Sequence, residues 1–108
     1  MSSSTAKLRA EDFLEVAVAR LRSTPFEQIA KWPEYPGQPN VNLQIPAELA
    51  KYKFTLMKDT LPSGDVRVGI QCYRYRFLGM GQMSVNGFVI SRDGTVRTLS
   101  EQDVWDLT

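Results

Sequence analysis

The run from Cys72 to Phe77 contains the residue types best suited to bind a ligand. Three aromatic residues alternate there with two arginines, in the order Tyr73, Arg74, Tyr75, Arg76 and Phe77. Aromatic rings at alternate strand positions can stack on nucleic-acid bases, and neighbouring arginines can contact phosphates. The four residues Tyr73, Arg74, Tyr75 and Arg76 are therefore candidates for contact with a protein or a nucleic acid.

The geometry of a strand argues against a nucleic-acid site in this run. Side chains alternate between the two faces of a sheet, so the aromatic residues should share one face and the arginines the other. The run resembles the aromatic strand of RNA-recognition modules, but it lacks the Gly-aromatic-Gly core of that motif. We favour an interpretation in which the aromatic residues belong to the core under a helix and the arginines face solvent.

A second candidate contact site lies in a proline-rich stretch. Trp32 and Tyr35 fall in or beside residues 33–40, which contain three prolines and Gly37 and can form neither a helix nor a ladder. Aromatic residues on loops often contact partners, so both are candidate contact residues. An equally good interpretation is that Trp32 closes one end of the core.

Catalytic and metal sites have little support in the composition. The chain contains no histidine and one cysteine, which excludes Ser-His-Asp and Cys-His chemistry and leaves almost no ligands for zinc or haem. Asp59, Asp65 and Asp93 fall at predicted strand ends and could meet in a cleft, but each also lies in or beside a turn that Asp can cap. We expect no metal, no cofactor and no enzymatic activity, and we expect Cys72 to be a buried small hydrophobic residue.

Charge is unevenly distributed along the chain, although the net charge is only +1. Residues 51–98 contain eight basic and three acidic residues, whereas residues 99–108 contain three acidic residues and no basic one. The basic segment could dock on an acidic partner, but the simpler expectation is that the acidic tail neutralises it within the fold.

Hydrophobic periodicity predicts an α+β fold. Apolar residues at three- and four-residue spacing predict a helix over residues 8–22, with a short second helix capped by Thr24. Alternation predicts strands at 52–57, 66–78, 83–90 and 96–99, and changes of phase near Gln71 to Tyr73 and at Asn86-Gly87 predict bulges. Residues 41–50 fit either a strand or a helical turn, and Ser100 predicts the N-cap of a short closing helix.

These elements predict one domain over residues 1–108, with residues 1–6 as a tail. The fold class is α+β: an N-terminal helix and a short second helix packed on a curved antiparallel sheet of three to five strands, with a short C-terminal helix. Residues 1–7 lack the apolar run of a secretory signal, and no stretch is long enough for a membrane span, so we expect a cytoplasmic protein.

The function expected from the sequence is a small non-enzymatic protein-binding module. Adaptors, antitoxin or immunity-type inhibitors and homodimeric accessory proteins all fit this description, and the partner is a protein, a second copy included. The alternative is a nucleic-acid or nucleotide binder that uses the strand from Tyr73 to Phe77.

Overall fold

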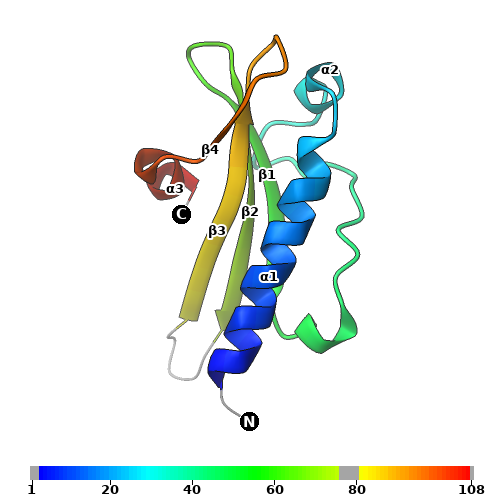
Figure 1. Cartoon of the computed structure of the whole chain (residues 1–108), viewed down its shortest axis with the longest axis vertical. Helices are drawn as coiled ribbons and strands as arrows, with labels where there is room; N and C mark the ends of the chain where they lie inside the picture. The colour runs from blue at the N-terminus through cyan, green and yellow to red at the C-terminus, as the bar shows by residue number, and fades with distance from the viewer. Residues whose placement is uncertain (1–2, 76–80, 108) are drawn as a thin grey trace.

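The computed structural model describes residues 3–75 and 81–107 and contains three helices and a four-stranded sheet within these ranges (Figure 1). The helices are α1 (Ser3–Arg22), α2 (Phe26–Ala30) and α3 (Glu101–Leu107), with a short 3-10 turn, η1, at Ala47–Leu49. The strands are β1 (Lys53–Thr60), β2 (Val66–Tyr75), β3 (Gly81–Ile90) and β4 (Val96–Thr98). None of the helices in the described ranges is both long and apolar enough to cross a membrane.

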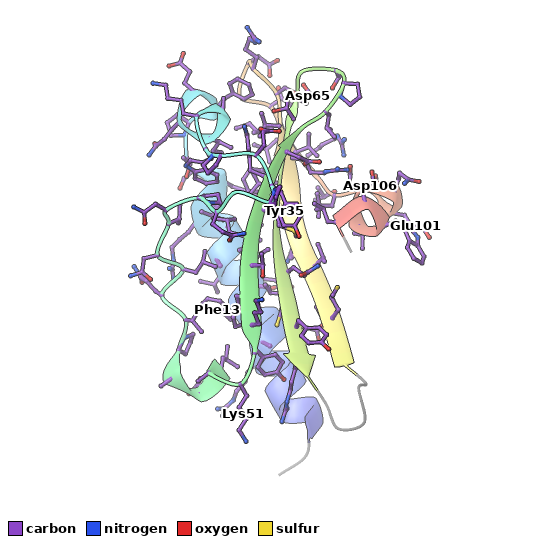
Figure 2. All side chains as sticks on the ribbon, turned by 180° about the vertical axis from the view of Figure 1, so that it is seen from behind. Phe13, Tyr35, Lys51, Asp65, Glu101 and Asp106 are labelled. Atoms are coloured by element: carbon purple, nitrogen blue, oxygen red, sulfur yellow. The ribbon has the colours of Figure 1, made fainter. Side chains whose placement is uncertain are left out.

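The sheet is a simple antiparallel meander in the order β1-β2-β3-β4, and its two faces have different covers. Helix α1 runs along one face, which we call the helix face, while α3 lies on the opposite, second face (Figures 1 and 2). The predicted α+β class, with an N-terminal helix on an antiparallel sheet and a short C-terminal helix, is confirmed.

The main core lies between α1 and the helix face. The predicted stripe of α1 is buried, and it packs with sheet residues that include Ile70 and Phe88, both fully buried. The members of the stripe are Phe13, Leu14, Ala17, Val18 and Leu21. The ring of Phe13 meets the ring of Phe54 edge to face, with centroids 5.0 Å apart. The prediction that this helix buries its stripe against the sheet is therefore confirmed.

The predicted bulges are wrong. The register of β2 with β3 runs from Val66 opposite Ile90 to Tyr75 opposite Gly81 without an inserted residue, and that of β1 with β2 is equally regular. The change of phase arises because Tyr73 and the other odd-numbered residues lie on the second face while the even-numbered residues lie on the helix face, so one regular strand carries apolar residues on both faces. Gly87 is needed for a different reason: an added Cβ would lie 2.0 Å from the carbonyl oxygen of Val68.

Some local boundaries differ from the predicted ones, and the alternative left open for residues 41–50 is decided in favour of a helical turn. Helix α1 begins at Ser3, so it includes residues expected to form a tail. The N-cap of α2 is Pro25, whose carbonyl accepts the first helical hydrogen bonds, and not Thr24, and no side chain caps this helix. Residues 41–50 contain the 3-10 turn η1 and no strand.

Residues 33–46 form an irregular segment, which we call the strap, that connects α2 to η1 beside β1 (Figure 1). The buried ammonium group of Lys58 anchors its start. It donates hydrogen bonds to the carbonyl oxygens of Ala30 (3.1 Å) and Trp32 (3.2 Å) and to the carboxylate of Glu34. The hydrogen bond from Lys58 also lowers the pKa of Glu34.

Candidate interaction surface

The cross-strand register arranges the second face into four rows of side chains. The rows are Lys53, Tyr73 and Met83; Thr55, Gln71 and Val85; Met57, Gly69 and Gly87; and Asp59, Arg67 and Val89. We call the first two rows the open half and the last two rows the covered half. Helix α3 contacts the covered half through Arg67 and Gly69 and reaches the open half at Gln71 alone among the contacts that the structure describes.

Arg67 is the centre of the covered half, and only 6% of it is exposed. Its guanidinium group donates to both carboxylate oxygens of Asp59, at 2.9 and 2.5 Å, and to Asp103 and Asp106 of α3 at 3.1 and 3.0 Å. The hydrogen bond to Asp59 is the largest cause that raises the pKa of Arg67 above its ordinary value. This buried cation therefore ties α3 to β1 and β2.

The start of α3 is fixed by a reciprocal cap. The backbone N–H of Asp103 donates to Ser100 Oγ at 3.2 Å, while the backbone N–H of Ser100 donates to Asp103 Oδ2 at 2.8 Å. The predicted N-cap at Ser100 is thus confirmed. Burial alone would raise the pKa of Asp103, but hydrogen bonds from Ser100, Arg97 and Arg67 outweigh it and hold that pKa well below its usual range.

The far end of α3 contacts the middle of the sheet. Leu107 lies directly over Gly69, where an added Cβ would be 2.7 Å from Leu107 Cδ1. The side-chain amide of Gln71 donates to the carbonyl oxygen of Leu107 at 3.2 Å. Gln71 therefore marks the boundary between the covered and the open half.

These contacts neutralise much of the basic segment within the fold, as the charge distribution predicts. Lys58 pairs with Glu34, while Arg67 and Arg97 pair with acidic residues of α3. The guanidinium carbon of Arg74 lies 5.5 Å from the centroid of the Tyr52 ring. Four of the seven basic residues that the structure describes in 51–98 therefore have internal partners, and the basic excess is a weaker reason to expect an acidic partner than the sequence indicates.

The open half is accessible and mainly uncharged. Met83 is 44% exposed, and Tyr73 opposite it is half-buried. A groove of about 540 Å³ runs beside Tyr73, and Gln71, Thr55, Lys53 and residues of the strap line it as well. Its size falls in the range of pockets that bind small molecules or side chains.

The structure separates the residues of the predicted aromatic strand. Tyr73 lies on the second face and Arg74 lies on the helix face, so they do not form one surface. The expectation that the aromatic residues pack under α1 is wrong for Tyr73, because the unbroken register gives the helix face to the even-numbered residues of β2. The side chain of Tyr75 and the whole of Arg76 and Phe77 lie outside the described residues.

The two aromatic candidates in and beside the strap have different positions. Trp32 is half-buried and packs against the core, as its structural interpretation predicts. Tyr35 is 55% exposed, lies in front of the sheet and lines the groove of the open half (Figure 2). Of the four predicted contact residues whose side chains the structure describes, Tyr35 and Tyr73 therefore meet at one site, whereas Trp32 and Arg74 lie elsewhere.

Sequence reasoning missed the other residues of this surface, including Met83, Val85 and Thr55. The available signal was the hairpin pairing of β2 with β3, which places Met83 opposite Tyr73. To infer this register from the sequence, the position of the turn between the two strands must be known. A shift of the register by one residue would have placed Met83 on the other face of the sheet.

The described residues offer no catalytic constellation. Asp59 is bound to Arg67, and Asp93 accepts a hydrogen bond from the backbone N–H of Thr95 at 2.9 Å, so these carboxylates do not meet in a cleft. No group of three potential metal ligands occurs within the part of the chain that the structure describes. Cys72 is buried, and this burial, with a smaller effect of Glu11, raises the pKa of its thiol to about 11.

Comparison with known proteins adds no functional information. No protein-family model, no curated protein and no solved structure matches this chain. The functional argument therefore rests on the surface itself.

Proposed function

We propose that this chain is a non-enzymatic protein-binding module and that its open half receives a protein partner. The proposal rests on one observation: on the same face of the sheet, the side chains of one half are mostly buried and those of the other half are partly or fully exposed. In the covered half Met57 is 4% exposed, whereas Met83 in the open half is 44% exposed. The open half combines Tyr73, an exposed methionine and the adjacent Tyr35, which are residue types enriched in protein interfaces.

The side chains of the open half also indicate the chemistry of the partner. Lys53 is its one charged residue; the others are Thr55, Gln71, Tyr73, Met83 and Val85. A complementary surface would place an apolar side chain against Tyr73 and Met83 and a carboxylate near Lys53. The amide of Gln71 and the hydroxyl of Thr55 offer polar contacts in the row beside them.

Charge favours a protein over a nucleic acid at this site. Lys53, Arg67 and Arg97 on the second face are balanced by Asp59, Asp103 and Asp106, so the sheet residues and α3 that the structure describes on this face carry no positive excess. Binding to a phosphate backbone depends on such an excess. Arg74, which would supply a phosphate contact, lies on the other face beside Tyr52.

A photo-crosslinking and binding experiment tests the proposal. A benzophenone amino acid at position 83 should capture a partner in native lysate, whereas the same group at the similarly exposed Val16 on α1 should not. The captured protein is then purified and titrated against the wild type, Tyr73→Ser and Val16→Ser. We expect Tyr73→Ser to weaken binding about tenfold or more, and Val16→Ser to leave it unchanged.

Two outcomes would overturn the proposal. One is a purified partner that binds Tyr73→Ser as tightly as the wild type. The other is salt-sensitive micromolar binding of a single-stranded oligonucleotide that Tyr73→Ser abolishes, since this would make the open half a nucleic-acid site.

A further inference from the structure

The outer edge of β3 is only partly paired. Strand β4 pairs with Phe88, Val89 and Ile90, but β3 extends back to Gly81. Beside the remaining part of β3, neither view shows another described element (Figures 1 and 2). An unpaired edge exposes backbone N–H and C=O groups that can pair with another strand.

The ladder determines which backbone groups point outward. On the opposite edge of the sheet, the carbonyl oxygen of Lys58 accepts a hydrogen bond from the N–H of Tyr35 at 2.8 Å, so the even-numbered residues of β1 face away from β2. Alternation across the antiparallel pairs then directs the odd-numbered residues of β3 to its outer edge. The N–H of Gly87 is capped by Asn86 Oδ1 at 2.7 Å, which leaves Met83 and Val85 with outward groups that no described backbone group meets.

The residues of β3 favour a second β3 as the occupant of this edge. Edge strands are commonly protected by charged residues or proline, and β1 on the other edge carries Lys53, Lys58 and Asp59. Strand β3 has neither charge nor proline over its ten residues. Two copies of this strand can therefore lie side by side without any opposed charge, and one segment supplies both sides of a two-fold interface.

We propose that two copies of this chain pair antiparallel through the free edges of β3, about a two-fold axis at Ser84. Met83 of each copy then lies opposite Val85 of the partner subunit, and each pair exchanges both of its backbone hydrogen bonds. The two-fold axis is perpendicular to the sheet, so the two open halves lie side by side on one surface between the two α3 helices. This goes beyond the proposed function, because it depends on the backbone of the edge and not on a partner for the face.

The free segment is short, so the association should be weak. Pairing along about five residues buries far less than the roughly 1,000 Å² expected of a stable specific interface. We therefore expect a monomer at low concentration and a dimer in the range of tens to hundreds of micromolar, roughly.

Sedimentation velocity over a concentration series tests this pairing. The weight-average sedimentation coefficient of the wild type should rise with concentration. Met83→Lys places charges beside the axis and should weaken dimerisation about tenfold or more, while Val16→Lys at a similarly exposed site should behave as the wild type. Val85→Pro removes an outward N–H that makes no ladder bond and should have the same effect as Met83→Lys.

Hydrogen exchange of the wild type locates the interface independently of any variant. The amides of Met83 and Val85 should exchange more slowly at high than at low protein concentration, whereas amides of α1 should not change. A wild type that stays monomeric, or a dimer whose exchange at Met83 and Val85 is independent of concentration, would overturn the inference. A persistent monomer would leave the proposed binding of a partner to the open half intact.

Discussion

The covered and open halves of the second face are built on the same strands, yet their side chains differ in how far they are exposed to solvent. Val89 in the covered half is 1% exposed, while Met83, six residues earlier on the same strand, is 44% exposed. The pleat and the register are continuous between them. What differs is α3, which Arg67 holds over one half only. The exposure of this face is therefore decided by a distant helix and not by the strands themselves.

Removing Arg67 should have the largest effect, because the covered half depends on it. Arg67→Ala leaves the buried carboxylate of Asp103 with fewer donors, and we expect a loss of about 3 to 5 kcal/mol in the free energy of unfolding, measured by urea denaturation. Lys53→Ala in the open half is the matched control and should change it by less than about 0.5 kcal/mol. Equal effects of the two substitutions would remove the distinction between the halves.

The two central glycines should differ in their tolerance of a methyl group. At Gly87 an added Cβ meets the backbone of β2, so Gly87→Ala should lower the free energy of unfolding by about 1 to 3 kcal/mol. At Gly69 the obstacle is the terminal methyl group of Leu107, which can move. Thermal melts of both variants should therefore rank Gly87→Ala as the less stable, and the reverse order would contradict the close approach of β2 and β3.

Acid should weaken the covered half before the sheet. The pKa of Asp103 is depressed in the fold, so its stabilising contribution is complete above the unfolded value of about 3.9 and is lost as pH falls through and below it. Asp103→Asn has no carboxyl group at this position, so its free energy of unfolding does not include this pH-dependent contribution. The stability difference between wild type and Asp103→Asn should therefore narrow by on the order of 1 kcal/mol between neutral pH and about pH 3. A difference that stays constant with pH would show that the Asp103 carboxylate is not the group that titrates.

Several elements were predictable from the sequence because their signals are local. The stripe of α1, the cap at Ser100 and the turn at Asp93 each depend on residues within one or two turns of chain. The second face was not predictable, because its central contact joins Arg67 to Asp103 across 36 positions. An arginine between two buried valines has the pattern of a solvent-facing residue, and only a docked acidic helix makes it a buried one.

The predicted bulge caused a second error on this face. Apolar residues at both even and odd positions of β2 were expected to share one face, which required a bulge, and that bulge moved Tyr73 under α1. The candidate site was therefore recovered only in part. The aromatic residues Tyr73 and Tyr35 were identified, but the surface that joins them was not.

The attachment of α3 through Arg67 also has a consequence for local unfolding. Helix α3 is the last element that the structure describes and forms no part of the sheet, so it can detach while α1 and the hairpins remain folded. In that state Gly69 loses the cover of Leu107, and of the three carboxylates that bind Arg67 only Asp59 remains beside it. A molecule in this state exposes more of its second face, and the additional surface is buried again when α3 rebinds.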